Sequence, residues 1–232
     1  MSLRLLIQEC WQRFSRMGRD DWHLFYSKPV TLEAAIGSWI YHWPYLWQVR
    51  REAKVSALEI GCGRGVHSTL LSYTVGHVVG VDSEAELVTE ARRQNSKFHG
   101  RARFLHGNAF DLGFPERSFD VCFSQGFLEH FSDKEICLLV DKQLSFAKTV
   151  VASVPSNYYP TRDKGDERLM LMEDWRRILD NYDTKIFHYG FKPLEPEKAI
   201  SLKNLDLRKV VLSKSYKLHL CIIAKKRVPD RN

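Results

Sequence analysis

The stretch LEIGCGRGVHS, residues 58–68, places Gly61, Gly63 and Gly65 at alternate positions between an apolar run and a segment with helical spacing. Glycine has no Cβ and adopts backbone angles that other residues avoid, so a ligand can lie close to such a loop. After a strand and before a helix, the loop forms the usual ligand site of an open α/β sheet. A phosphate, a dinucleotide and another small ligand are the candidates.

Two common phosphate-binding loops do not fit this stretch. A Walker loop has Lys followed by Ser or Thr after its last glycine, whereas Val66 and His67 follow Gly65. The dinucleotide fingerprint has a small residue where Val66 stands, and a β-branched side chain there spoils the close packing of helix on strand. The polar residues that follow the next strands must therefore identify the ligand.

Asp82 ends the second apolar run, GHVVGVD, residues 76–82. An acidic residue at this place can accept hydrogen bonds from the hydroxyl groups of a ribose. The alternative is that Asp82 caps the following helix, but Ser83 can take the N-cap position instead. We expect the ribose role.

Two further strands are followed by polar groups at the same edge of the predicted sheet. Asn108 and Ala109 follow the third strand, where the Asn108 amide and the Ala109 backbone N–H can bind an adenine ring. The alternative role of Asn108 is to form a turn after Gly107. Gln125 and Gly126 follow the fourth strand and would face the glycine loop, beside the amino-acid end of the ligand.

An alternation of strands and helices must position these residues. Apolar runs of strand length alternate with stretches of helical spacing, which implies parallel βαβ units with right-handed crossovers. A helix over residues 132–144 begins with Ser132 as N-cap and has Glu135 in place for a capping box. The predicted strands are residues 55–60, 76–82, 102–109, 118–125 and 149–155, and the other helices run from the glycine loop to about residue 74 and over residues 83–98.

The end of the chain breaks this alternation. Two strand-like runs, residues 205–212 and 216–224, are separated by three residues, so they are predicted to form an antiparallel hairpin. The predicted fold is α/β: a Rossmann-like open sheet, mostly parallel with a C-terminal antiparallel hairpin, with helices on both faces.

Composition divides the chain into two parts. Residues 1–54 hold five of the six tryptophans, and Thr31 can act as N-cap of a helix with regularly spaced apolar residues. We predict an aromatic-rich helical cap over residues 1–54 and the main domain over residues 55–232. Residues 156–191 are interpreted as an insertion, a loop followed by a helix. We expect the insertion and the cap to form a substrate site together.

The stretches LEIGCGRGVHS, VVGVD and GNAFDLGFPERSFDVCFSQGFLEHF, with the terminal hairpin, resemble a class I S-adenosylmethionine-dependent methyltransferase. More narrowly, they resemble its small-molecule branch, with the pattern D-x-G-x-G … L-P-F-x-x-x-S-F-D. Two residues depart from the family pattern, since Asn108 replaces the usual acidic residue and Gly113 replaces Leu or Pro.

The resemblance implies S-adenosyl-L-methionine as cofactor and methyl transfer to a small-molecule acceptor by in-line displacement. It also implies which residues bind the cofactor. These are Glu59, Gly61, Cys62 and Gly63 around the methionine moiety, Asp82 at the ribose, Asn108 with Ala109 at the adenine, and the backbone carbonyl of Gln125 at the α-amino group.

Methyl transfer from a sulfonium mainly requires alignment of the nucleophile and exclusion of water. A general base is needed only where the acceptor carries a proton that leaves early. His130, in LEHF beside the cofactor site, and His188, in FHYGF, are the candidate bases, and a structural role is the alternative for each. We expect no metal site and free thiols, because the five cysteines are scattered without metal-ligand spacing.

The formal net charge of +7 is spread along the chain, so nucleic acid is compatible with the sequence but not favoured as partner. After the fourth strand stands SQGF, and not the Asn/Asp-Pro-Pro-aromatic sequence common in enzymes that methylate flipped bases. The alternatives are an RNA methyltransferase and a cofactor-binding scaffold that has lost catalysis, and a nicotinamide-dependent oxidoreductase is more distant. The sequence leaves the oligomeric state open.

No apolar run approaches the roughly 18 to 20 residues that span a bilayer. The N-terminal apolar stretch stops at Ile7, which is short for a signal peptide. We expect a cytoplasmic protein.

Overall fold

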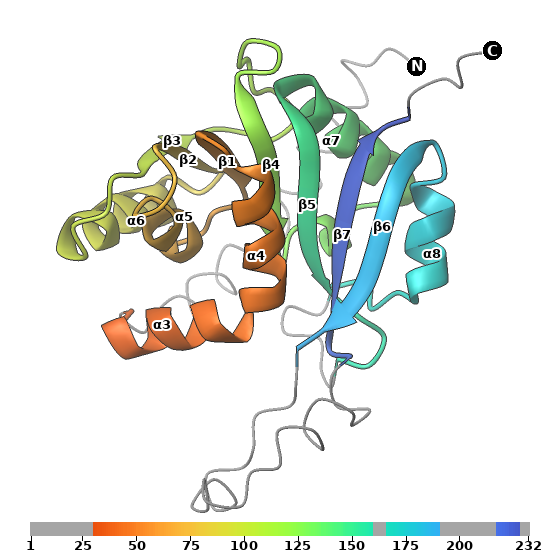
Figure 1. Cartoon of the computed structure of the whole chain (residues 1–232), viewed down its shortest axis with the longest axis horizontal. Helices are drawn as coiled ribbons and strands as arrows, with labels where there is room; N and C mark the ends of the chain where they lie inside the picture. Colours follow the sequence, from red (N-terminus) through yellow and green to blue (C-terminus); the bar gives the residue numbers. More distant parts are fainter. Residues whose placement is uncertain (1–29, 160–165, 191–216, 228–232) are drawn as a thin grey trace, which may run out of the picture.

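The computed structural model describes residues 30–159, 166–190 and 217–227. Within these ranges, seven strands form one sheet in the order β3-β2-β1-β4-β5-β7-β6 (Figure 1). The strands are β1 Ser56–Ile60, β2 His77–Asp82, β3 Arg103–His106, β4 Phe119–Gln125, β5 Ala147–Pro155, β6 Tyr182–Tyr189 and β7 His219–Lys226.

Strands β1 to β5 are parallel neighbours, and they are the five strands that the sequence predicts. The strand order reverses between β1 and β4, since β2 and β3 lie on one side of β1 and the later strands on the other. Open α/β sheets bind their ligands beyond the carboxyl ends of the strands at such a point. The residues that follow β1, β2, β3 and β4 therefore meet at the expected place.

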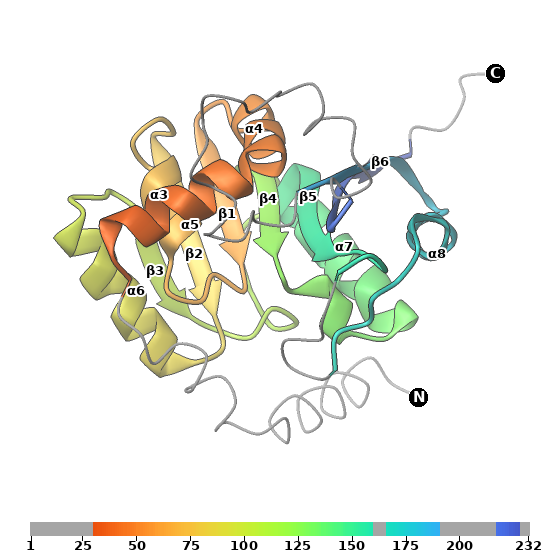
Figure 2. The ribbon, with the colours of Figure 1, turned by 90° about the horizontal axis from the view of Figure 1, so that it is seen from below.

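Helices cover both faces of the sheet, as predicted (Figure 2). Each face has its own apolar core, because neighbouring residues of a strand point to opposite sides. Leu58 of β1 packs in one core with α7 and α8, whereas Ala57 packs in the other with α4, α5 and α6. The helices are α3 Leu32–Tyr41, α4 Trp43–Glu52, α5 Val66–Leu71, α6 Ala85–Lys97, α7 Asp133–Phe146 and α8 Met172–Ile178, with a 3-10 turn η1 at Leu128–His130.

Two of three predicted helix caps are confirmed. The Thr31 side chain accepts a hydrogen bond from the N–H of Ala34 at the start of α3. Ser132 and Glu135 form the capping box of α7. The prediction for Ser83 is wrong, because α6 begins one residue later than a Ser83 cap requires and its N-cap residue, Glu84, makes no side-chain cap bond.

The terminal strand is antiparallel, as predicted, but its neighbours differ from the prediction. β7 lies between β5 and β6 and pairs antiparallel with both. The other strand of the predicted hairpin, residues 205–212, lies outside the described residues, and both edges of β7 are already paired. β6 lies in the last part of the expected insertion and is not among the predicted strands. The helix expected there is confirmed as the shorter α8.

The N-terminal helices differ in how far they are buried. Tyr45, Leu46 and Val49 of α4 are fully buried in the core that α5 and α6 share. Several large apolar side chains of α3 and α4 remain exposed, namely Leu32, Ile36, Ile40, Trp43 and Trp47.

Three of the described cysteines, Cys62, Cys122 and Cys221, are buried free thiols, and Cys137 is a partly buried one. Cys10 lies outside the described residues. Among the helices that the structure describes, none is long and apolar enough to cross a membrane.

Candidate functional site

The glycine loop is tied to the end of β2 by backbone hydrogen bonds. The N–H groups of Gly61 and Cys62 both donate to the carbonyl oxygen of Val81, at 2.9 and 3.0 Å. The N–H of Gly63 donates to Oδ2 of Asp82 at 2.8 Å. The loop predicted to surround the methionine moiety is thus preformed, and Asp82 helps to shape it.

The close neighbours of the glycines in this structure are aromatic side chains. Gly61 has φ +69°, and a Cβ at this position would lie 2.7 Å from Cδ2 of Phe127. Gly65 also has φ +69°, and a Cβ there would overlap the ring of Phe104. Glycine is therefore required at both positions by backbone angle and by packing.

Glu59, predicted beside the methionine moiety, lies beneath the loop at the end of β1. Its carboxylate accepts hydrogen bonds from the backbone N–H of Ser68, at 3.1 Å, and from the Ser68 hydroxyl. These bonds tie β1 to the first turn of α5. Burial raises the pKa of Glu59 to about 8. Burial lowers the pKa of the neighbouring His67 to about 4, and its Nδ1 lies 3.9 Å from Oε1 of Glu59.

Asp82 lies at the end of β2, where the sequence predicts it. Besides Gly63, it binds the N–H of Glu84, which donates to Oδ1 at 3.0 Å. Asp82 therefore partly takes the helix-capping role that is the alternative to ribose binding. An ionised carboxylate has about four acceptor positions, so each oxygen can still accept from a ribose hydroxyl. Burial raises the pKa of Asp82, and hydroxyl donors would offset that desolvation.

Asn108 forms a turn after β3. Its side-chain Oδ1 accepts from the N–H of Phe110 at 3.0 Å, and its carbonyl accepts from the N–H of Asp111 at 3.0 Å. The turn that the sequence analysis gave as an alternative is present. The side-chain NH₂ still supplies two donors for a base ring, and the neighbouring Ala109 is partly buried.

Gln125 ends β4 beside β5, and the N–H of Gly126 donates to the Ser153 carbonyl at 2.9 Å. The chain then turns through Phe127, which covers Gly61, into η1 with Glu129 and His130. The backbone at Gln125 is thus one short turn from the glycine loop.

The segment after residue 165 contributes two acidic residues to the same place. Arg168 anchors this segment: its N–H donates to the Glu129 carbonyl at 3.1 Å, and its guanidinium binds the Phe131 carbonyl and Asp133. Asp166 and Glu167 are thereby held beside η1. Part of the predicted insertion therefore lies against the end of β4.

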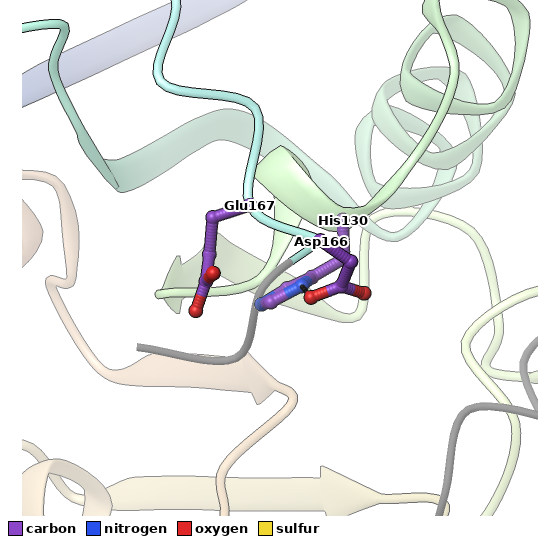
Figure 3. Close-up of side chains that lie close together, drawn as sticks. All are labelled: His130, Asp166 and Glu167. Carbon is purple, nitrogen blue, oxygen red and sulfur yellow. Dashed lines mark hydrogen bonds and ion pairs between the residues drawn. The ribbon is translucent and has the colours of Figure 1, made fainter. Parts of the chain in front are cut away.

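His130, Asp166 and Glu167 gather in one group (Figure 3). Nδ1 of His130 lies 3.0 Å from Oδ1 of Asp166. One side-chain atom of each residue lies within 4.8 Å of the others, a spacing at which such groups can hold a metal ion. The expectation of no metal site rests on the scattered cysteines alone and stays a prediction. The acidic pair in GDERL lies in a charged stretch typical of exposed loops, so the sequence does not indicate its place beside His130.

Glu129 adjoins this group and is buried, with 1% of its surface exposed. Its Oε2 has no hydrogen-bond partner among the described residues. Burial raises the pKa of Glu129 to about 7, and the charges of His130, Glu167 and Asp166 also act on it. We call Glu129, His130, Asp166 and Glu167 the acidic cluster.

A second group, of aromatic and histidine side chains, joins the N-terminal helices to the last strands. Nδ1 of His42, between α3 and α4, lies 2.8 Å from the Tyr189 hydroxyl of β6. The His42 ring also packs against the rings of His67 and His219, at centroid distances of 5.4 and 5.2 Å. The cap and β6 thus meet at the carboxyl edge. His188 lies on β6 outside this group, with its ring 5.7 Å from that of Tyr158.

The two groups are electrostatically connected. Burial raises the pKa of Tyr189 well above its ordinary value, and the charge of Glu129 adds to this rise. The charge of Glu129, a member of the acidic cluster, therefore also acts on Tyr189 in the aromatic and histidine group.

Comparison with known proteins supports one family. Residues 57–147 match the family described as Methyltransferase domain. A probable S-adenosylmethionine-dependent methyltransferase of Mycolicibacterium smegmatis is 29% identical over 126 residues, which is 51% of this chain and 48% of that protein. Phosphoethanolamine N-methyltransferase 3 of Arabidopsis thaliana is 30% identical over 95 residues, which is 40% of this chain and 19% of that protein.

Among solved structures, magnesium protoporphyrin IX methyltransferase of Synechocystis PCC 6803 with bound SAM matches with a TM-score of 0.57 at 17% identity, over 93% of this chain and 94% of that one. This likeness concerns the fold. The chain spans less than half the length of the two curated relatives that it matches.

Proposed function

We propose, on the premise that the chain belongs to the class I S-adenosylmethionine-dependent methyltransferases, that it transfers a methyl group to a small-molecule acceptor. The cofactor of this family is S-adenosyl-L-methionine, which supplies an electrophilic methyl group on a sulfonium. The chain's own residues must bind this cofactor, orient the acceptor and exclude water.

The residues after β1 to β4 fit such a cofactor. We assign the ribose hydroxyls to Asp82, the adenine to the Asn108 side-chain NH₂ with the Ala109 backbone, and the α-amino group to the Gln125 carbonyl. What supports this is that Asp82 keeps acceptor positions after binding Gly63 and Glu84. The methionine end of the cofactor is then shaped by Glu59, Gly61, Cys62 and Gly63. Glu59 acts on it indirectly, through the hydrogen bond that it accepts from Ser68.

The observation that carries the small-molecule assignment is the burial of the groups beside this site. Glu129, His42, Tyr189 and His219 are all less than one-tenth exposed. They come from the α3–α4 junction, η1, β6 and β7, so these elements pack closely together beside the proposed cofactor site. An acceptor bound among them would be largely buried, as small-molecule ligands are. The curated relative named for phosphoethanolamine, a small molecule, is consistent with the assignment.

His130 is the proposed general base, and Asp166 is its positioning residue. An ionised carboxylate only accepts hydrogen bonds, so Nδ1–H of His130 donates to Oδ1 of Asp166. In the neutral ring, Nε2 then carries the lone pair that can take a proton. A base that a carboxylate orients in this way is a recurring arrangement in catalysis.

Calorimetry with S-adenosylmethionine, followed by a methyl-transfer screen over small molecules and RNA, tests the proposal. We expect binding that Asp82→Asn weakens, and turnover on a small molecule. Turnover on RNA alone would favour the RNA methyltransferase. Cofactor binding without turnover on any acceptor would favour the silent scaffold, and no cofactor binding would contradict the proposal altogether.

A further inference from the structure

We propose that the acidic cluster binds the ammonium group of the methyl acceptor, so that the acceptor is an amine. This inference rests on the proposed function and names the substrate class of the same site. Four observations bear on it: the gathering of carboxylates near His130, the burial of Glu129, the place of the cluster beside the glycine loop, and the chemistry of proton removal.

Two segments that are distant in the chain bring carboxylates to the neighbourhood of His130. Glu129 comes from η1, whereas Asp166 and Glu167 come from the segment that Arg168 anchors. In Figure 3 the His130 ring lies between the carboxylates of Asp166 and Glu167. Like charges repel at such distances, so a bound cation would add to the stabilisation that the hydrogen bond from His130 to Asp166 supplies.

The spacing of the cluster suits an ammonium group. Hydrogen bonds from an ammonium to carboxylates are about 2.7–2.9 Å long, so acceptors in tetrahedral directions stand about 4.4–4.7 Å apart. One ligand atom each of His130, Asp166 and Glu167 lies within 4.8 Å of the others, and Nδ1 of His130 is 3.0 Å from Oδ1 of Asp166. Carboxylate oxygens of Asp166 and Glu167 within this distance can both accept hydrogen bonds from one ammonium group.

Glu129 supplies an independent observation. Its side chain is 99% buried, since 1% of its surface is exposed, and its Oε2 has no hydrogen-bond partner among the described residues. An unpaired buried carboxylate oxygen is costly, and a charged donor would satisfy it. Glu129 directly precedes His130 in η1, and the charges of Glu129 and His130 each shift the pKa of the other, so the two side chains lie near one another.

The cluster lies where an acceptor must be. Phe127 packs on Gly61 of the cofactor loop and precedes Glu129 by two residues. The charge of Glu129 also raises the pKa of Tyr189 in the aromatic and histidine group. An amine held by the cluster would thus be near aromatic rings, which also attract cations.

The reaction balances with the groups present. An ammonium R–NH₃⁺ gives one proton to the His130–Asp166 pair, at Nε2, and becomes R–NH₂. The nitrogen lone pair then forms a bond to the methyl carbon while the carbon–sulfur bond breaks and leaves its electron pair on sulfur. The products are R–NH₂–CH₃⁺ and S-adenosylhomocysteine, and the proton leaves His130 to solvent.

The test uses the full chain loaded with S-adenosylhomocysteine. Thermal melts are recorded with amines, alcohols and carboxylates that share propyl, benzyl and phenethyl groups, and calorimetry measures the affinities. We expect the amines to raise the melting temperature and the other two sets to leave it unchanged. Glu167→Gln and Asp166→Asn should weaken amine binding about tenfold or more. Asp183→Asn, an exposed carboxylate at the far end of β6, should not change it.

Several results would overturn the inference. Binding of the alcohols or carboxylates in place of the amines, binding of no amine, or equal amine binding by Glu167→Gln and Asp166→Asn would each do so while cofactor binding stands. A shift with Mn²⁺ or Zn²⁺ that Glu167→Gln abolishes, with none from amines, would identify a metal site instead. Failure of the chain to take S-adenosylhomocysteine would contradict the proposed function itself, and this inference with it.

Discussion

Nδ1 of His130 lies 3.0 Å from Oδ1 of Asp166, although 36 residues separate the two in the chain. The contact joins the turn after β4 to the segment before α8. It also fixes which ring nitrogen of His130 can act as a base, because Nδ1 is engaged as a donor. The pair is therefore the most direct place to test catalysis.

Asp166→Asn should change the pH dependence of turnover. Burial lowers the pKa of His130, the hydrogen bond with Asp166 raises it, and the net change is a rise above 6.5. If neutral His130 is the base, activity increases as pH rises through this pKa. Removing the charge of Asp166 lowers the pKa, so the acid limb of the kcat profile should move to lower pH.

The maximum kcat of Asp166→Asn should also fall, by less than the roughly 10²–10⁴-fold that loss of a whole general base costs. His130→Asn should show the full loss. Steady-state kinetics between about pH 5.5 and 9 give the maximum kcat and the position of the acid limb. Asp183→Asn is the matched control. An acid limb that stays in place in Asp166→Asn would remove Asp166 from the mechanism.

Gly61→Ala should destabilise the glycine loop by about 1–3 kcal/mol. The substitution places a Cβ 2.7 Å from the Phe127 ring at φ +69°. Urea denaturation measures the loss, and calorimetry should show weaker binding of S-adenosylmethionine. Gly113→Ala is the control, because nothing lies within 4 Å of a Cβ there. Adding Phe127→Leu to Gly61→Ala should recover part of the stability, and no recovery would mean that the strain is in the backbone alone.

Glu59→Gln should flatten the dependence of stability on pH. The pKa of Glu59 is about 8 in the folded chain against an ordinary 4.5, so folding favours its protonated form. Its stabilising contribution is full below pH 4.5 and is lost as pH rises through 8, by about 1 kcal/mol per pH unit.

His67 has the opposite effect, because its pKa of about 4 lies below the ordinary 6.5. Its penalty disappears as pH rises from 4 to 6.5, which partly hides the effect of Glu59 there. The difference between wild type and Glu59→Gln should therefore be clearest between pH 6.5 and 8, in urea denaturation at several pH values. Parallel curves for the two proteins over that window would show that Glu59 is ionised in the folded chain.

Asp82→Asn should weaken binding of S-adenosylmethionine about 10- to 100-fold, because hydrogen bonds to a charged group contribute about 1.5–3 kcal/mol. The amide can still accept from the Gly63 N–H, so the loop should persist. Calorimetry measures the affinity, and urea denaturation checks that the fold is intact. An unchanged affinity in Asp82→Asn would leave Asp82 with its structural bonds to Gly63 and Glu84 only.

The sequence predicts the five parallel strands well, because β1, β2, β4 and β5 are short, mostly apolar runs buried in the sheet. β6 was missed for the opposite reason. Its sequence, YDTKIFHY, mixes charged and apolar residues, as suits a strand at the edge of the sheet that is only partly buried. The apolar run at residues 205–212 is predicted to pair with the terminal strand in place of β6.

The positions of the residues proposed for the cofactor were predictable, because they follow strand ends that the sequence reveals. Glu59, Asp82 and Asn108 lie at the expected strand ends and each binds a backbone N–H, whereas their cofactor roles stay predictions. The acidic cluster was not predictable beyond His130. Asp166 and Glu167 lie in a charged stretch typical of exposed loops, and only the tertiary contacts of Arg168 bring them to η1.

The placement of β7 inside the sheet has a consequence for biosynthesis. β6 has β7 as its strand neighbour, and β7 is translated some thirty residues after β6 ends. The contact of Tyr189 with His42 therefore requires β7 to be synthesised first, because β6 joins the sheet through β7. A nascent chain that has already collapsed around β1 to β5 would therefore still lack the edge of the sheet that carries Tyr189.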